Sequence, residues 1–470
     1  AVRGHEQYNR TISFVGGDRN DWSFYNHVLK RTVNMTAGPA WGDSAVFLFA
    51  FDGEPVQPKE AKAAHLRSWA EFYARCGDIF TGNAEEEFMF HNSLYLLRSG
   101  FDDVSGYPIG HPFFFPGCWN QCMFWDMHFV FNGLYRANDT ASASRVVDIL
   151  LRVLRKQGKP YPWMFIYDGT TFLDDSRDIA PLVIAAHAMT AVKYYEYTLD
   201  KKALKEKVWP ILSRCCDYAT SSMFRREADG KWIIALAVSN DVVDEEGEEI
   251  NQTFTTVWFL TLLRKATEYA PLVGAEADPE WAEILADYRL EIADGEYLQC
   301  RGLSAADARW ASWIPFLAYP SEGMPFLDKD VLRRTREHYS YRFLYLDKQN
   351  CFQPWTELIE AEAAHRSGEK EIAYDMVRYA LRYVFGDGYF CEVGPMQQTC
   401  GFPPYISAHG QYLSVMADMF LGSSVWKKRV RIGCEFPSEW NGKDLRAVRL
   451  RASKGVFAES IEYSGRGAAA

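Results

Sequence analysis

Apolar residues recur every three or four positions between residues 58 and 421, which is the spacing that places them on one face of an α-helix. In the stretch from Lys59 to Arg75, for example, Ala63, Leu66, Trp69 and Tyr73 share such a face. The pattern predicts helices over residues 59–75, 84–98, 124–136, 140–157, 178–199, 202–222, 252–270, 279–298, 329–342, 354–367, 369–385 and 405–421. The middle of the chain is therefore predicted to be helical almost throughout.

The two ends of the chain follow a different pattern. Segments 10–15 and 45–51 are short and apolar, with Gly and Asp turns between them, as is typical of β-strands. Segments 430–432 and 445–450 read as strands too, and the second alternates apolar and basic residues as a half-exposed strand does. We therefore expect a β-rich segment at 1–57, a helical domain at 58–422 and a small β-appendage at 423–470.

The connections between the predicted helices alternate between short polar ones and long ones. The long connections are rich in aromatic, Gly and Pro residues, and they cover residues 100–123, 158–177, 299–328 and 386–404. Long loops in a compact domain usually carry function. Six helical hairpins with such loops at one end predict a mainly α fold, an (α/α)6 barrel whose loops line a cleft.

Composition narrows the classes of ligand. The formal net charge of -11 argues against nucleic acid, because phosphate binding requires basic surface. Aromatic residues make up 15% of the chain, and their flat apolar faces suit the C–H faces of sugar rings, although a large aromatic core accounts for most of them. No apolar run is long enough to cross a membrane, and no signal peptide is visible.

The ten cysteines are spaced without a metal-binding motif, and we expect free thiols in a reducing, cytoplasmic location; secretion after processing stays open. The chain also lacks the glycine-rich nucleotide-binding motifs and the His-Glu-x-x-His metal motif. We therefore expect neither a cofactor nor a metal. The pattern does not indicate an oligomeric state.

Two aromatic segments that precede predicted helices are candidates for sugar binding. Phe124-Trp125-Asp126 follows a loop rich in aromatic residues and glycine that also contains Trp119. An acid after a tryptophan can bind sugar hydroxyls while the indole stacks on the ring, but on spacing alone Asp126 is more often a helix cap. Tyr161-Pro162-Trp163 lies in the next long loop.

The densest run of acids, residues 239–249, lies between an apolar stretch and the helix that begins near Asn251. Glycoside hydrolysis needs a protonated carboxylic acid, and neighbouring carboxylates in an apolar cleft raise a pKa enough to supply one. Asp241, Asp244 and Glu245 compete for this role. The ordinary interpretation of such a run is a solvated charged loop.

The last long connection contains a second acidic candidate. Glu392 precedes the final predicted helix and is a candidate base that orders water, with Gln398 nearby. His409 lies on that helix, where a histidine is more often a satisfied core group. Trp355 and Glu357 open an earlier helix and complete the candidates.

Several of these segments resemble, in order, the glycoside hydrolase family of maltose, kojibiose and trehalose phosphorylases and acid trehalases. The matching segments are Trp69-Ala70-Glu71, Phe124-Trp125-Asp126, Tyr161-Pro162-Trp163, Asp178-Ile179-Ala180, residues 251–258 and residues 436–440. The resemblance covers about residues 60–460. It implies a helical-barrel glycosidase with a sugar-binding Phe-Trp-Asp, and an acid just before the Asn-rich helix start at Asn251.

The chain also departs from that family. The family's Pro-Asp-Glu-Tyr-His segment is replaced by residues 239–246, and among the acids there we favour Asp241 because it lies nearest the matched core strand. The family's phosphate-binding His-x-Ser-Ser is not visible near residues 353–357, which disfavours a phosphorylase. The hydrolase base before a glycine is replaced by Pro404-Tyr405, so Glu392 or Glu357 must substitute.

The prediction is therefore a glycoside hydrolase, inverting, that acts on a carbohydrate through carboxylic acid and carboxylate groups. The alternatives are a disaccharide phosphorylase, a sugar isomerase or epimerase with histidines in the cleft, and a sugar-binding relative without catalysis. The candidate catalytic residues are Asp241, Asp244, Glu245 and Glu392, and those for substrate binding are Trp119, Trp125, Asp126, Tyr161, Trp163, Trp355, Glu357, Gln398 and His409.

Overall fold

The computed structural model divides the chain into two compact units, Ala1–Arg75 and Cys76–Ala470. It describes the backbone of residues 12–14, 22–25, 28–31 and 49–51, and residues 58–99, 123, 125, 127–157, 160–162, 165, 181–235, 251–302, 325–338, 354–382, 384–385, 388–390, 405–422 and 436–465. The predicted boundaries after residues 57 and 422 stay predictions.

The first unit contains two antiparallel strand pairs and one helix. β1 (Ile12–Phe14) pairs with β4 (Phe49–Phe51), and β2 (Trp22–Tyr25) pairs with β3 (Val28–Arg31). Helix α1 (Pro58–Arg75) begins with a proline, whose missing N–H costs nothing at a first turn, and it ends with an arginine that complements the helix dipole. The strands predicted at 10–15 and 45–51 and the helix predicted at 59–75 are confirmed.

The second unit is built on five helices that are largely or wholly buried. In packing order they are α11 (Pro354–Arg366), α13 (Ile406–Leu421), α3 (Met127–Arg136), α5 (Pro181–Thr198) and α8 (Thr253–Val273). Every residue of α3, α11 and α13 is buried. A helix that is buried on all sides must be covered on all sides by other elements, so these helices form an inner layer.

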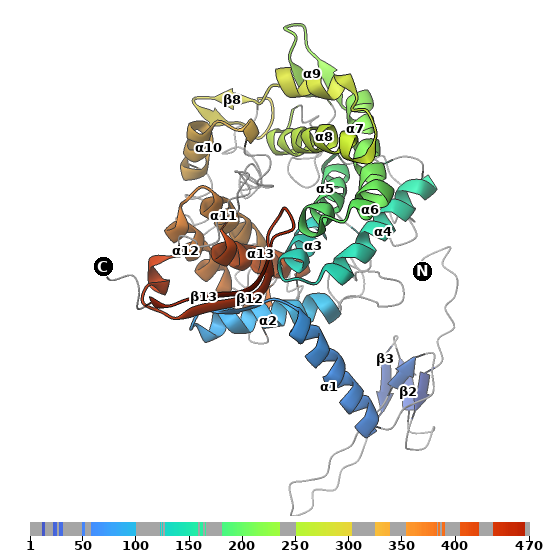
Figure 1. Ribbon diagram of the computed structural model, residues 1–470, viewed down its shortest axis with the longest axis vertical. Helices are drawn as coiled ribbons and strands as arrows, with labels where there is room; N and C mark the ends of the chain where they lie inside the picture. The colour runs from blue at the N-terminus through green and yellow to red at the C-terminus, as the bar shows by residue number, and fades with distance from the viewer. Residues whose placement is uncertain are drawn as a thin grey trace, which may run out of the picture. The chain divides into compact units, whose positions relative to one another are not determined.

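A second layer of helices covers the first (Figure 1). α2 (Ala84–Ser99) packs on α13, α4 (Thr140–Gln157) on α5, α7 (Trp209–Ser222) on α5 and α8, α9 (Pro279–Asp287) on α8, and α12 (Lys370–Leu381) on α11. In α4 and α12 the buried positions recur at helical spacing, which leaves the opposite face in water. Consecutive helices therefore pack against each other in the pairs α3–α4, α7–α8, α8–α9 and α11–α12, as helical hairpins do.

A close contact between two inner helices, α3 and α13, is made by glycines. Gly133 of α3 faces Gly410 of α13, and a Cβ atom added at Gly410 would lie 2.5 Å from the Cα of Val130. Such a distance is shorter than any van der Waals contact, so only glycine allows the two backbones to approach this closely. The crossing brings the N-terminal ends of α3 and α13 to the same end of the inner layer.

Small sheets lie at the margins of the helices. β5 (Asp78–Phe80), β12 (Leu445–Arg451) and β13 (Phe457–Tyr463) form an antiparallel sheet in the order β13-β12-β5. The strand predicted at 445–450 is confirmed, whereas the one predicted at 430–432 lies outside the described residues. β6 (Phe224–Arg226) and β7 (Trp232–Ile234) form a hairpin, as do β10 (Val384–Phe385) and β11 (Tyr389–Phe390).

One predicted helix ends early. The periodicity predicted a helix over residues 279–298, but α9 ends at Asp287, and β8 (Ile292–Ala293) then pairs with β9 (Glu296–Tyr297). Asp294 and Gly295 join these strands with φ values of 52° and 79°. An Asp-Gly pair is the typical two-residue turn of a β-hairpin because both residues tolerate positive φ. The local turn signal therefore outweighs the helical periodicity.

Candidate active site

The predicted functional segments share one position relative to the inner layer, because each precedes or opens an inner helix. Trp125 comes just before α3, Tyr161 lies upstream of α5, and Trp355 and Glu357 lie in the first turn of α11. The acidic run ends where α8 begins, and Glu392 precedes α13 in the sequence. The N-terminal ends of the inner helices are therefore the candidate active site.

Aromatic side chains from three inner elements meet at this end. The ring of Trp355 lies 5.2 Å from that of Trp125, 5.1 Å from that of Phe129 on α3, and 5.6 Å from that of Tyr405, which caps α13. All four residues are buried. We call these four residues the aromatic wall. Its edge-to-face and tilted contacts, which suit aromatic quadrupoles, give a rigid apolar cluster at this end of the inner layer.

Glu357 lies in the first turn of α11 and is completely buried, and neither of its carboxylate oxygens has a hydrogen-bond partner. Burial raises the pKa of Glu357 well above the ordinary value, so the side chain is held in the neutral form. Positions two apart on a helix point to nearly opposite faces. Since Trp355 contributes to the aromatic wall, Glu357 is directed away from it.

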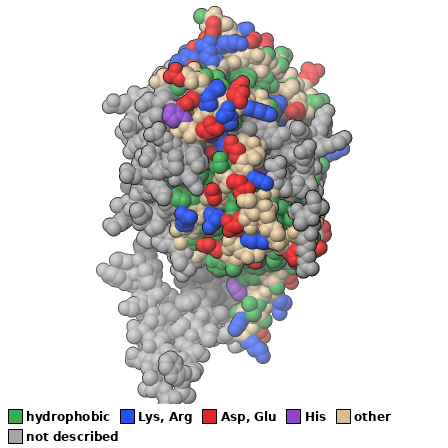
Figure 2. Space-filling view, turned by 90° about the vertical axis from the view of Figure 1, so that its left-hand side faces the viewer, with side chains coloured by type: hydrophobic (Ala, Val, Ile, Leu, Met, Phe, Trp, Pro, Cys, Tyr) green, Lys and Arg blue, Asp and Glu red, His purple; other side chains and the backbone are tan. Residues whose placement is uncertain are grey.

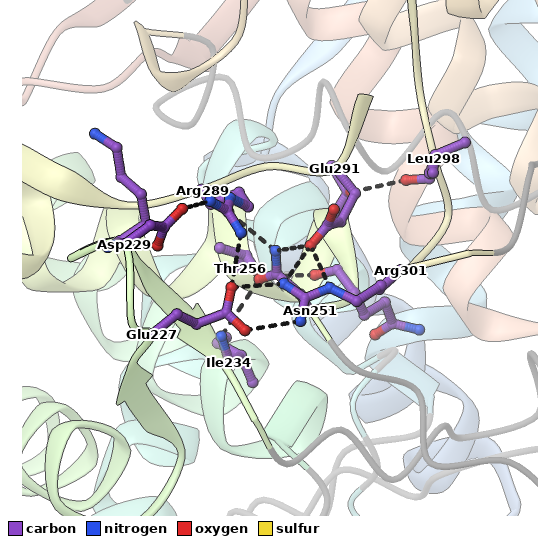
Figure 3. A network of polar contacts seen from close by, with 12 residues as sticks. Glu227, Asp229, Ile234, Asn251, Thr256, Arg289, Glu291, Leu298 and Arg301 are labelled. Atoms are coloured by element: carbon purple, nitrogen blue, oxygen red, sulfur yellow. Dashed lines mark hydrogen bonds and ion pairs between the residues drawn. The ribbon is translucent and has the colours of Figure 1, made fainter. Parts of the chain in front are cut away.

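The start of α8 is fixed by a polar network that surrounds Asn251 (Figure 3). The backbone N–H of Asn251 donates to the carbonyl oxygen of Ile234 on β7 at 2.9 Å, and the backbone N–H of Ile234 donates to Oδ1 of Asn251 at 3.3 Å. Nδ2 of Asn251 donates to the carbonyl oxygen of Arg289 at 3.1 Å and to Oε1 of Glu291 at 3.0 Å. The side chain of Asn251 therefore joins β7 to the segment before β8.

Ion pairs extend this network outward. Arg301 donates to Oε1 and Oε2 of Glu227 at 2.8 and 3.0 Å and to Oε1 of Glu291 at 3.0 and 2.9 Å. Arg289 pairs with Glu227 at 2.7 Å and also with Asp229. The hydrogen bonds from Arg301 lower the pKa of Glu227, so its carboxylate stays ionised. The end of the acidic segment is thus attached to a framework of several elements.

Two other predicted site residues are held by protein groups. Tyr161 is buried, and its hydroxyl donates to the carbonyl oxygen of Leu150 at 3.0 Å. Nε2 of His409 accepts from the backbone N–H of Phe390 at 3.2 Å, so Nδ1 carries the proton and faces Oγ of Ser93 at 2.9 Å. Burial lowers the pKa of His409 to about 3, which keeps the ring neutral. Both side chains are fixed by these contacts, and their role in sugar binding stays a prediction.

The opposite end of the inner layer carries a buried cluster of charges. Asp418 of α13 pairs with Arg136 at the end of α3 and accepts from Nε and Nη2 of Arg366, the last residue of α11, at 3.1 and 3.0 Å. Arg366 also pairs with Glu362 one turn earlier. Burial would raise the pKa of Asp418, but the guanidinium groups of Arg136 and Arg366 outweigh it and hold the pKa below its usual value. This cluster joins the C-terminal ends of three inner helices.

The other predicted site residues lie outside the described residues. They are Trp119, Asp126, Trp163, Asp241, Asp244, Glu245, Glu392 and Gln398. Among the side chains that the structure describes, no group of three or more His, Cys, Asp or Glu residues is placed to hold a metal ion. Sequence reasoning missed the roles of Phe129 in the aromatic wall and of Asn251 in the network. The position of Asn251 directly before the Thr-rich start of α8 was the available signal.

Residues 162–277 match the model of the glycosyl hydrolase family 95 catalytic domain. The chain is also 26% identical over 295 residues to a kojibiose hydrolase of Mucilaginibacter mallensis, a match that covers 59% of this chain and 42% of that protein. A periplasmic acid trehalase of Saccharomyces cerevisiae is 22% identical over 386 residues, covering 75% of this chain and 31% of that one. The chain thus spans less than half the length of these curated relatives.

The structure of a putative kojibiose phosphorylase from the human microbiome matches 97% of this chain and 77% of its own, with a TM-score of 0.61 and 11% identity. The chain is a divergent relative of the helical-barrel glycosidases. The (α/α)6 barrel predicted for this chain is confirmed, and so is its predicted relationship to these glycosidases. The matched range 162–277 includes the acidic run and the network around Asn251.

The described surface of this chain is in keeping with a carbohydrate ligand rather than a nucleic acid. Figure 2 shows acidic and basic side chains interspersed over the described part of one face, without a continuous basic patch of the kind that nucleic acids bind. Within the described ranges, no helix combines the length and the apolar character needed to span a lipid bilayer. The expectation of a carbohydrate ligand is in keeping with the relatives named above.

Proposed function

We propose that this chain hydrolyses the glycosidic bond of a gluco-disaccharide such as kojibiose, by inversion and without a cofactor. The observation that carries the proposal is the family match over residues 162–277, which spans the acidic run and the whole of α8. The aromatic wall supports it, because apolar rings gather at the N-terminal ends of α3, α11 and α13, the end at which the candidate segments join the inner helices in the sequence. The likeness to kojibiose hydrolases suggests the substrate class.

In the proposed reaction, Asp241 gives its proton to the glycosidic oxygen as the bond from that oxygen to the anomeric carbon breaks. Glu392 takes a proton from a water molecule that attacks the anomeric carbon from the opposite face, and the product therefore has the inverted configuration. Asp244 and Glu245 are the alternative acids. Glu357 is the alternative base, but Glu392 is preferred because burial raises the pKa of Glu357 and favours its neutral form. Trp125, Asp126 and Trp163 would hold the sugar.

The test is turnover of kojibiose, trehalose and maltose with and without phosphate, with the anomer of the product followed by NMR. We expect phosphate-independent release of glucose in the inverted anomeric form. Replacement of Asp241 by Asn should lower kcat about 10²- to 10⁴-fold, the usual contribution of a general acid. Turnover that requires phosphate would make the chain a phosphorylase, and an active Asp241→Asn variant would transfer the role to Asp244 or Glu245.

We propose further that the protein resides in the cytoplasm. Cys76, Cys215, Cys216 and Cys300 are buried free thiols within the described ranges, as expected in a reducing compartment. The likeness to a periplasmic enzyme makes the alternative concrete. Fractionation of the native source decides between them, since recovery in the periplasmic or culture fraction would refute the cytoplasmic location.

A further inference from the structure

Ile234 and Asn251 bound the segment that contains all three candidate acids. Two hydrogen bonds join them, from Asn251 N to Ile234 O at 2.9 Å and from Ile234 N to Asn251 Oδ1 at 3.3 Å. We call this pair of bonds the Ile234–Asn251 clamp. The clamp holds together residues 234 and 251, the two positions from which the acid-bearing segment extends. Joining the two ends of a segment lowers its conformational entropy.

The clamp depends on asparagine specifically. Asn251 has φ +58°, a left-handed conformation that asparagine and glycine adopt more readily than other residues. Its side chain is fully buried, and both of its polar atoms are engaged, Oδ1 by Ile234 and Nδ2 by Arg289 and Glu291. An aspartate in its place could not donate to Glu291 and would face that carboxylate. A glycine would keep the backbone conformation and lose every side-chain bond.

We propose that Asn251 is a positioning residue for the general acid. It acts through the clamp, by holding both ends of the acid-bearing segment against β7 and the Arg301–Glu291 ion pair. The inference rests on the proposed function, because it needs a proton donor within residues 235–250. Catalytic groups misplaced by about 1 Å can lose about 10²-fold in rate. A loosened clamp should therefore impair proton donation more than it impairs binding.

The experiment compares a substrate that needs the proton with one that does not. Kojibiose has a sugar alkoxide as its leaving group and requires general acid assistance, whereas α-glucosyl fluoride releases fluoride without it. In Asn251→Gly and Asn251→Asp we expect kcat for kojibiose to fall about 10²-fold, with kcat for the fluoride within about threefold of wild type. KM for kojibiose should change less than kcat.

The matched control is Asn132→Ala. Asn132 is also a buried asparagine with two side-chain bonds, to Ser414 at 2.6 Å and from Tyr197 at 3.1 Å, but it lies on α3. It should lower the melting temperature while reducing both rates by the same factor. A second pair of variants tests the hydrogen bond from Asn251 to Glu291. Glu291→Gln keeps an acceptor for Asn251 and should preserve the ratio of kcat for kojibiose to kcat for the fluoride, whereas Glu291→Ala should lower that ratio.

The outcomes separate the two levels of the proposal. Wild-type protein that turns over neither substrate overturns the proposed function, and the positioning role with it. If the wild type is active and the Asn251 variants lose both rates equally, as the Asn132→Ala control does, the clamp is only structural and the inference is wrong. The positioning role is supported if the Asn251 variants lose kcat for kojibiose but not for the fluoride, and if Glu291→Gln keeps the ratio of the two rates while Glu291→Ala lowers it.

Discussion

Replacement of Asp418 by Asn should destabilise the second unit strongly. Asp418 is fully buried, and its Oδ2 lies 3.0 Å from Nη2 of Arg366. Two opposite charges at that separation attract by about 5.5 kcal/mol at an effective dielectric constant of about 20. The substitution also leaves Arg136 without its carboxylate. Removing one member of a buried pair typically costs about 3–5 kcal/mol, and we expect a loss of that size.

The assay is urea unfolding followed by tryptophan fluorescence. With a slope of about 3 kcal/mol/M, the expected loss lowers the midpoint by about 1 to 1.7 M. Because the pKa of Asp418 lies below its usual value of 3.8, its contribution is present above that pH and disappears as the pH falls through the folded-state pKa. The difference between wild type and variant should therefore persist from pH 7 to about pH 4 and shrink below it.

The matched control is the double variant Asp418→Asn with Arg136→Met, which removes the stranded charge. We expect its loss of unfolding free energy to be about 2 kcal/mol smaller than the sum of the losses in the two single variants, because the groups interact directly. Added salt should leave the difference unchanged, since the cluster is buried. An unchanged midpoint, or a difference that 0.5 M salt abolishes (roughly a 4 Å screening length), would refute the reasoning.

Three further predictions concern other buried positions. In Gly410→Ala the new Cβ would meet the backbones of Val130 and Phe129 at 2.5 and 2.6 Å. We expect the free energy of unfolding to fall by about 2 kcal/mol after the gain in helix propensity, which should be seen as a lower melting temperature. An unchanged melting temperature would contradict the packing. The fold favours the neutral form of Glu357, so the stability of the wild type falls as the pH rises above 4.5. The stability of Glu357→Gln relative to wild type, measured by urea unfolding, should therefore increase by about 1.4 kcal/mol per pH unit. The pKa of His409 is about 3 in the folded protein and 6.5 in the unfolded chain, so the stability that its neutral ring provides above pH 6.5 is lost as the pH falls from 6.5 to about 3. His409→Gln should be less stable than wild type at pH 7, but its stability should fall less steeply between pH 6.5 and about 3. Parallel stability curves for the two proteins would contradict the assignment.

The helices could be predicted from periodicity because each segment carries its own apolar pattern. Helix α4 was predicted at 140–157 and is found there, and α11 was predicted at 354–367 and ends one residue earlier. What the pattern could not give is the complete burial of α11, since its sequence contains Glu357, Glu360 and Glu362. Polar residues are read as exposed unless their partners are known, and the partner of Glu360 is Arg336, which lies 24 residues earlier in the sequence.

Candidate site residues could be named from the sequence, but their mutual geometry could not. The aromatic residues Trp125 and Trp355 were singled out, but their contact depends on the packing of α3 and α11, which sequence periodicity does not report. Asn251 was recognised only as a helix start, because its left-handed conformation and its bond to Ile234 arise from tertiary structure. Local patterns identify elements, whereas the partners of buried polar groups are set by the fold.

The sheet order β13-β12-β5 has a consequence for biosynthesis. β5 lies at the start of the second unit, but its hydrogen-bonding edge is filled by β12, which is made only after all the helices. At about 5–20 residues per second, the nascent chain presents an unpaired strand edge for on the order of half a minute. During that interval the edge of β5 is open to wrong pairing with other strands, and the sheet is completed only after β12 has been synthesised.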